Sequence, residues 1–202
     1  LNNESIKNFS LPKINQIKVT GLENNESIEL LKNLKVFQIK NLFFLDQSQI
    51  KEIFNSNNLI ENYTIFKRYP STLEIKIYKT KFLANTNKNG IFFLVGSNSK
   101  LIQSKKIKKN IPFIFGDFEI QNFLKLKKNI DNSKLNYQDI KNIYFFPSGR
   151  WDIEMKSGIL IKLSKYKIVE SLDLSIEILL DNEFDNIDLI DLRQNNQVVI
   201  NG

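Results

Sequence analysis

The sequence predicts an α+β protein made of two modules, and two observations lead to this prediction. The first part of the chain carries apolar patterns in the order strand, helix, helix, strand, strand. From Phe82 onward the pattern changes to repeated hairpins with helices between them. The 202 residues, 42% of them hydrophobic, suffice for two small cores. We therefore expect a tether over residues 1–11, a first module over 12–82 and a second over 83–202.

The clearest element of the first module is a β-hairpin over Tyr63–Tyr78. Apolar residues alternate along it and place Tyr63, Ile65, Leu73, Ile75 and Ile77 on one face. Glu74 and Lys76 alternate with them and are expected on the opposite, solvent-exposed face. Pro70 and Ser71 are typical of the turn. A hairpin with one apolar face needs a covering layer, which the upstream helices can supply.

A short strand and two helices precede this hairpin. The strand runs through Ile14, Ile17 and Val19 to a turn at Gly21. A first helix is predicted over Glu26–Asn33. Its apolar stripe is expected to consist of Ile28, Leu31 and Leu34.

Stronger signals mark the second helix. Asp46 is a suitable N-cap, Gln49 stands at the capping-box position, and Leu45 can pack against Ile50 across the cap. The apolar stripe continues through Ile53 and Phe54 and ends at Asn55–Asn58.

The second module contains a series of strands and helices, predicted as a mostly antiparallel sheet with helices on it. Asn89-Gly90 is the strongest hairpin signal in the chain. Ile111–Gly116 is expected to be an apolar loop that fills the core. The predicted strands are Phe82–Thr86, Ile91–Val95, Lys100–Ile102, Ile140–Phe146, Trp151–Met155, Ile159–Leu163, Ile187–Arg193 and Val198–Ile200, the last two joined near Asn195-Asn196. Helices are predicted over Phe118–Asn129 and along Ile168, Leu172, Ile176 and Leu179, with a weaker helical signal at Ser133–Gln138.

Composition argues against several classes of function. Because the chain has no Cys and no His, it offers no disulfide framework, no zinc cage of the usual Cys/His type and no imidazole base. The pairs Asp152/Glu154 and Asp188/Asp191 lack a neighbouring nucleophile or oxyanion donor, so we predict no enzyme, no catalytic residue, no cofactor, no metal and no small-molecule substrate. The net charge is +7, but only three of the 29 basic residues are Arg, the better phosphate ligand, so nucleic-acid binding is not expected.

Six short motifs lie in order along the chain. They are Ile14-x-x-Ile17-x-Val19-x-Gly21, Leu45-Asp46 with Ile50, Lys67-Arg68-Tyr69-Pro70-Ser71-Thr72-Leu73-x-Ile75-x-Ile77, Ile111-Pro112 with Gly116, Gly149-Arg150-Trp151-Asp152 with Gly158, and Ile190-Asp191-Leu192-Arg193. All three arginines fall within them, in a chain that otherwise uses Lys. On these motifs the chain resembles the extracytoplasmic part of the FtsQ/DivIB family of bacterial cell-division proteins, whose first module is a POTRA domain.

This resemblance implies a POTRA domain (β-α-α-β-β) over 12–82, followed by an FtsQ-type C-terminal β-domain. It also implies a non-enzymatic divisome scaffold that binds small coiled-coil partners of the FtsB/FtsL type at the septum. No run in the sequence approaches a membrane span, and the chain begins at Leu1 rather than Met. We therefore expect a single-pass anchor in the cell inner membrane upstream of Leu1, with this fragment in the periplasm.

The predicted partner-binding surface is the C-terminal strand region. An edge strand presents unpaired N–H and C=O groups to which another protein can add a strand. The residues assigned to this surface are Asp191, Arg193, Gln194, Val198, Val199 and Ile200. Gln194 stands where relatives often carry an aromatic residue. The sequence also allows a strand that only completes its own sheet, and the resemblance favours partner binding.

Other surfaces and functions stay open as alternatives. Arg68 and Arg150 are secondary surface candidates, and pairing with a local carboxylate is the competing interpretation. The basic loop Lys105–Lys109 can face lipid headgroups or water. Trp151 alternates with Ile153 and Met155, which indicates core packing. The alternative functions are a POTRA-bearing chaperone or secretion component and, further removed, a basic nucleic-acid-binding domain.

Overall fold

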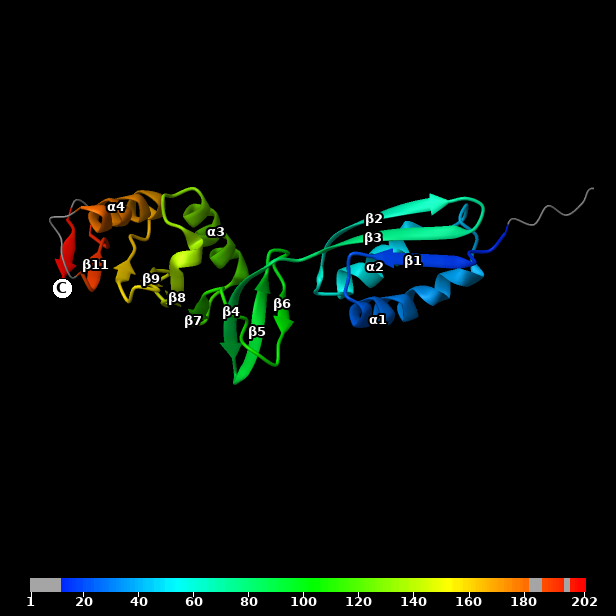
Figure 1. Ribbon diagram of the computed structural model, residues 1–202, viewed down its shortest axis with the longest axis horizontal. Helices are drawn as coiled ribbons and strands as arrows, with labels where there is room; N and C mark the ends of the chain where they lie inside the picture. The colour runs from blue at the N-terminus through cyan, green and yellow to red at the C-terminus, as the bar shows by residue number, and fades with distance from the viewer. Residues whose placement is uncertain (1–11, 182–186, 195–196) are drawn as a thin grey trace, which may run out of the picture. The chain divides into compact units, whose positions relative to one another are not determined.

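The computed structural model describes residues 12–181, 187–194 and 197–202. The chain forms two compact units, one ending at Thr80 and the other beginning at Lys81 (Figure 1). Each unit has its own apolar core. The predicted tether over residues 1–11 and the turn at Asn195-Asn196 lie outside the described residues.

The first unit has the predicted β-α-α-β-β order. Its elements are β1 (Gln16–Thr20), α1 (Asn24–Leu34), the 3₁₀ helix η1 (Lys35–Ile39), α2 (Gln47–Ser56), β2 (Ile60–Arg68) and β3 (Thr72–Lys79). Among the described residues the sheet has three strands in the order β1-β3-β2, with β1 parallel and β2 antiparallel to β3. The short η1 was not predicted, and its Phe37 is buried.

The hairpin β2–β3 has the predicted faces. Tyr63 lies opposite Ile77, and Ile65 lies opposite Ile75, so these side chains share one side of the sheet. The side chains of β3 on that side are fully buried. The ring of Phe54 from α2 packs edge-on against Tyr63, with 4.4 Å between the ring centroids. Helix α2 thus supplies the covering layer that the hairpin needs.

Helix α1 corrects one prediction. Ile28, expected in its apolar stripe, is 53% exposed, whereas Leu30 and Leu34 are buried against the sheet. Residues four apart share a helix face, and Ile28 lies about 200° around the helix from Leu30. Helix α2 has the predicted N-cap, where the Asp46 carboxylate accepts a hydrogen bond of 2.8 Å from the Ser48 backbone N–H. The predicted capping box is wrong, because the Gln49 side-chain oxygen accepts a hydrogen bond from Lys40 instead.

The second unit is a mixed sheet with helices. Its elements are β4 (Phe82–Lys88), β5 (Ile91–Gly96), β6 (Leu101–Gln103), β7 (Phe113–Phe115), α3 (Ile120–Asp131), the 3₁₀ helix η2 (Tyr137–Asp139), β8 (Ile140–Phe145), β9 (Trp151–Met155), β10 (Leu160–Lys162), α4 (Ile168–Leu180), β11 (Leu189–Asp191) and β12 (Val199–Asn201). The described strands form one nine-stranded sheet in the order β12-β11-β10-β9-β8-β7-β4-β5-β6.

Pairing in this sheet is mostly antiparallel, as predicted. Of the eight pairings between described strands, three are parallel: β4 with β7, β7 with β8, and β10 with β11. The expectation of a loop over Ile111–Gly116 was wrong, although Ile114 is buried in the core as expected. The centre of this segment, Phe113–Phe115, is strand β7, hydrogen-bonded between β4 and β8. Such a short strand, bounded by Pro112 and Gly116, has too few residues to show a strand period.

A row of isoleucines crosses the sheet and forms the base of the core. Strand register places one isoleucine of each of six strands beside the next: Ile200, Ile190, Ile161, Ile153, Ile143 and Ile114. Helices α3 and α4 cover this face with Phe123, Leu126 and Leu172, among others (Figure 1). The predicted core residue Trp151 is buried, and its ring packs at 4.6 Å from Phe145.

Candidate functional site

The candidate site is the edge of the second sheet formed by β12. This strand pairs with β11 on one side, and no described strand pairs with its other side. Two of the predicted site residues, Val199 and Ile200, belong to β12. Which of their main-chain groups point outward follows from the bonds between β10 and β11, because successive residues of a strand direct their N–H and C=O groups to alternate sides.

Strand β11 directs alternate residues toward β10. Leu160 donates its N–H to the C=O of Asp188 over 2.9 Å, and Leu192 donates its N–H to the C=O of Lys162 over 2.9 Å. The Asp188 C=O and the Leu192 N–H therefore point to β10, whereas the Asp188 N–H, just before β11, donates to the C=O of Asn201 on β12 over 2.9 Å. By alternation Ile190 also turns its main chain toward β10.

The remaining residues of β11 turn toward β12. Leu189 is paired with Asn201, and Asp191 is paired with Val199. Val199 and Asn201 therefore direct their N–H and C=O groups inward, to β11. Ile200, between them, directs its N–H and C=O to the open side of the sheet.

The side chains of this edge point to two different environments. Ile200 packs against the core beside Ile190. Val198 and Val199 are 38% and 49% exposed. The edge thus offers outward main-chain groups from one residue and apolar side chains from its neighbours.

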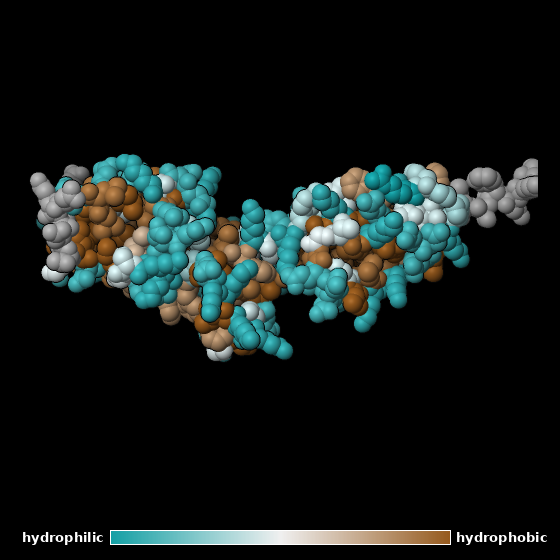
Figure 2. All heavy atoms as spheres, in the orientation of Figure 1, coloured by the Kyte–Doolittle hydropathy of each residue, from teal (hydrophilic) through white to brown (hydrophobic). Residues whose placement is uncertain are grey.

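A groove of about 340 Å³ lies beside this edge. Helix α4 lines it with Ser171 and Leu174. The segment between β11 and β12 lines it with Leu192, Gln194, Gln197 and Val198. Figure 2 shows hydrophobic residues gathered over α4. Gln194 and Val198, both predicted as partner-binding residues, therefore line the same groove. The sequence did not predict that α4 lines this groove as well. Leu174 could have indicated it, because this apolar residue lies outside the predicted apolar stripe of the helix.

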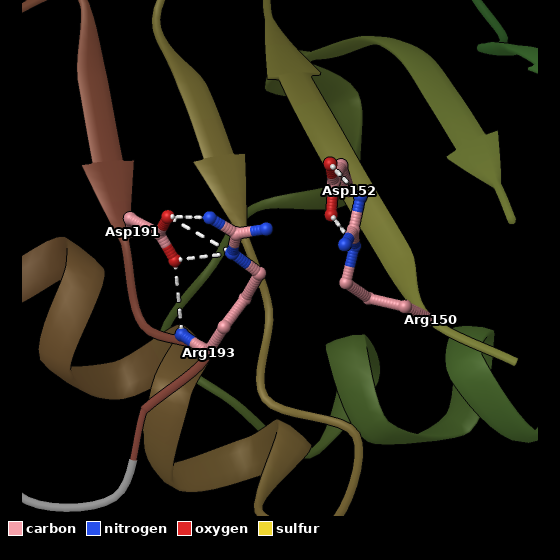
Figure 3. A network of polar contacts seen from close by, with 4 residues as sticks. All are labelled: Arg150, Asp152, Asp191 and Arg193. Atoms are coloured by element: carbon pink, nitrogen blue, oxygen red, sulfur yellow. Dashed lines mark hydrogen bonds and ion pairs between the residues drawn. The ribbon is translucent and has the colours of Figure 1, made fainter. Parts of the chain in front are cut away.

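Asp191 and Arg193 form an ion pair with each other. The Arg193 Nε donates to both carboxylate oxygens of Asp191 at 2.8 and 2.9 Å (Figure 3). These hydrogen bonds hold the pKa of Asp191 below its usual range. Since Arg193 is already paired, a bond to a partner carboxylate would compete with Asp191.

A second pair, Arg150 with Asp152, lies two strands away on the same face (Figure 3). The Arg150 Nε donates to Asp152 at 3.0 Å, and its guanidinium lies 4.1 Å from the centroid of the Phe146 ring. Burial raises the pKa of Asp152, although Arg150 opposes the change. Lys162 on β10 stands in register between Asp191 and Asp152. This arrangement gives Arg150 a role within the fold.

Arg68, the other secondary candidate, belongs to the first unit. Its Nε donates to Glu74 across the β2–β3 hairpin at 3.0 Å, and the guanidinium lies 5.3 Å from the Phe66 ring centroid. The arginine side chain nevertheless stays 63% exposed.

The described residues contain no group of three or more His, Cys, Asp or Glu side chains that would suit a metal ion. No helix within them has the length and apolar character needed to cross a bilayer. Of the carboxylates considered in the sequence, Asp152, Glu154 and Asp191 are engaged in ion pairs.

Comparison with known families decides the identity of the chain. Residues 13–78 match the POTRA domain, FtsQ-type, and residues 84–193 match the Cell division protein FtsQ/DivIB, C-terminal. The chain belongs to the FtsQ/DivIB family of cell-division proteins. Proteins of the FtsQ/DivIB family are not enzymes.

Individual relatives agree with this assignment. The chain is 25% identical over 166 residues to the cell division protein FtsQ of Rickettsia bellii, a match that covers 79% of this chain and 60% of that protein. It is 27% identical over 106 residues to the cell division protein DivIB of Clostridium acetobutylicum, covering 51% of this chain and 41% of that one. The chain therefore spans only part of the length of these FtsQ/DivIB proteins.

One solved structure is also similar. It is the major extracytoplasmic domain of DivIB from Geobacillus stearothermophilus, with 14% identity and a TM-score of 0.39, and the match covers 53% of this chain and 98% of that one.

Proposed function

We propose that this chain is the periplasmic part of a single-pass inner-membrane protein that binds small coiled-coil division proteins of the FtsB/FtsL type by strand addition at β12. The observation that carries the proposal is the open edge, where Ile200 directs its N–H and C=O outward. A partner strand pairing there would extend the sheet, and main-chain hydrogen bonds would supply much of the affinity.

The neighbouring side chains supply selectivity in this proposal. Val198 and Val199 offer apolar contact, and the groove beside α4 can receive a side chain or helix that follows the added strand. Gln194 lines that groove and contributes hydrogen bonding rather than aromatic area. Family membership favours this function over the chaperone and nucleic-acid alternatives.

The register of β12 decides which residue a test of strand addition must change. Pro at Val199 would remove an N–H that points to β11, so it would disrupt the chain's own sheet. Ile200→Pro removes the outward N–H instead, together with a packing side chain. Ile200→Ala truncates the side chain and keeps the N–H, and is therefore the matched control.

We expect Ile200→Pro to weaken binding of an FtsB/FtsL-type ectodomain at least about tenfold relative to Ile200→Ala, because one main-chain hydrogen bond is lost and the added strand is displaced. Titration calorimetry on folded variants measures the difference. Lys106→Glu, in the basic loop, should bind as the unchanged chain does. Equal binding by the two Ile200 variants, or loss in Lys106→Glu alone, would rule out strand addition at this edge.

A further inference from the structure

Three segments of the first unit meet at one end of it. The Ile14 N–H donates to the C=O of Lys40 over 2.8 Å, and the Asn15 N–H donates to the C=O of Ser71 over 3.0 Å. The start of the described chain, the segment after η1 and the turn between β2 and β3 are therefore neighbours. Figure 1 shows this gathering at the end of the unit where the described chain begins.

Large apolar side chains project from this end. Ile39 is 73% exposed, Phe43 55%, Phe44 77% and Tyr69 56%. The rings of Phe43 and Tyr69 lie 4.7 Å apart, so loop and turn form one surface. We name these four residues the aromatic tip. Ile39 is the last residue of η1, Phe43 and Phe44 lie in the loop after it, and Tyr69 lies in the β2–β3 turn, so these side chains project from the unit.

Positive charge predominates around the aromatic tip. Across Lys13–Asn15, Lys35–Leu45 and Phe66–Ser71, which together form this end, there is no Asp or Glu. These segments carry the five basic residues Lys13, Lys35, Lys40, Lys67 and Arg68. Two carboxylates lie just outside these segments: Glu74 pairs with Arg68, and Asp46 interacts with Lys40. The Lys40 ammonium also bonds to the Gln49 side-chain oxygen, and the Lys67 ammonium bonds to the Leu45 carbonyl oxygen.

An exposed aromatic cluster bordered by cations matches the surface of an anionic bilayer. Aromatic side chains are stable at the level of the lipid headgroups, where their rings leave water, and nearby Lys and Arg side chains are attracted to anionic headgroups. We propose that the aromatic tip of the first unit inserts into the interface of an anionic lipid membrane. An acidic protein would also complement the positive charge of this end. Projecting apolar side chains bordered by Lys favour a lipid surface, because a fluid bilayer can accommodate them without a pocket of complementary shape.

This contact is separate from the proposed partner-binding edge. The aromatic tip belongs to the first unit and β12 to the second, and the two surfaces share no residue. The tip requires no membrane-spanning anchor, because insertion of side chains and attraction of cations act on the chain as it stands.

The test is co-sedimentation of the full chain with lipid vesicles at low ionic strength. We expect binding to vesicles of phosphatidylcholine mixed with phosphatidylglycerol and at least about tenfold weaker binding to pure phosphatidylcholine. Phe44→Ser should weaken binding to the anionic vesicles about tenfold. Tyr166→Ser is the matched control, because Tyr166 is an exposed aromatic residue between two lysines in the second unit, and it should have no effect.

Charge is tested separately. Lys13→Glu combined with Lys35→Glu should reduce binding to the anionic vesicles at least about tenfold, and Lys105→Glu combined with Lys106→Glu should not. Both double variants change the net charge equally. They therefore distinguish attraction of anionic lipid to the aromatic tip from attraction to the net charge of the whole chain.

A fluorescence readout reports insertion directly. The only tryptophan, Trp151, is buried, so Phe44→Trp adds a responsive probe. We expect its emission to shift to the blue on addition of anionic vesicles and to be quenched by brominated lipid. The proposal is overturned if the unchanged chain does not sediment with anionic vesicles, if Phe44→Ser binds as the unchanged chain does, or if the added tryptophan does not respond. It is also overturned if sedimentation velocity shows that Phe44 instead mediates association of two copies.

Discussion

Glu154 shows how a polar side chain is held on the sheet of the second unit. Its carboxylate accepts hydrogen bonds from the Lys141 ammonium at 2.6 Å, the Tyr144 hydroxyl at 2.6 Å and the Asn142 amide at 2.9 Å. These bonds lower the pKa of Glu154 from 4.5 to about 2. A carboxyl with a lowered pKa in the folded state stabilises the fold above its unfolded pKa and loses that contribution as pH falls.

We therefore predict that Glu154→Gln lowers the free energy of unfolding at neutral pH by about 1–3 kcal/mol. The difference from the unchanged chain should shrink as the pH falls from 4.5 toward about 2, where Glu154 itself becomes protonated. Urea unfolding followed by circular dichroism across this range measures it. A difference independent of pH would show that the charge of Glu154 contributes nothing.

A second prediction at the residue scale compares two glycines with the same backbone conformation. Gly21 has φ of +94° and Gly158 has φ of +99°. A Cβ at Gly21 would lie 1.9 Å from the carbonyl oxygen of Ile77, whereas a Cβ at Gly158 meets no atom within 4 Å. Gly158→Ala should cost about 1–2 kcal/mol of unfolding free energy from backbone strain alone. Gly21→Ala adds a clash and should cost more. Equal losses in denaturant titrations would contradict the close approach of Gly21 to β3.

At the scale of the element, β3 is the centre of the first unit. It is the only described strand of that sheet with neighbours on both sides, and its apolar face carries Leu73, Ile75 and Ile77, all buried. Ile75→Asp would bury an unpaired carboxylate among them. We expect a loss of at least about 3 kcal/mol, visible as a large fall in the melting temperature of the first unit.

The control for this prediction lies next to it on the same strand. Lys76 is exposed on the opposite face, so Lys76→Asp should change the melting temperature little. An unchanged melting temperature in Ile75→Asp would mean that the assigned face is not buried in solution.

At the scale of the whole molecule, each of the two units has a hydrophobic core of its own. The first unit buries residues from Ile14 to Ile77, and the second buries residues from Ala84 to Leu192. We predict that a fragment of residues 12–82 folds alone, because it contains a complete sheet and both covering helices. Cooperative thermal unfolding and dispersed amide resonances would support this. A spectrum of a disordered chain would mean that the fragment needs the second unit.

Local patterns determined much of this protein from the sequence alone. The order of elements in the first unit, the faces of the hairpin and the cap at Asp46 follow from alternation, turn residues and helix periodicity, which involve residues close together in the chain. The final strand pair was likewise predicted, and its residues form β11 and β12. The motif order also indicated the family that the comparison then identified.

Tertiary structure decided the features that depend on distant residues. Strand β7 exists because β4 and β8, from before and after it in the chain, both pair with it. Ile200, not Val199, directs main-chain groups outward because the register of β10 with β11 sets the alternation in β12. The aromatic tip exists because Phe43 meets Tyr69, 26 positions away. Periodicity along a chain reports which side of an element is apolar, but long-range pairing decides what that side faces.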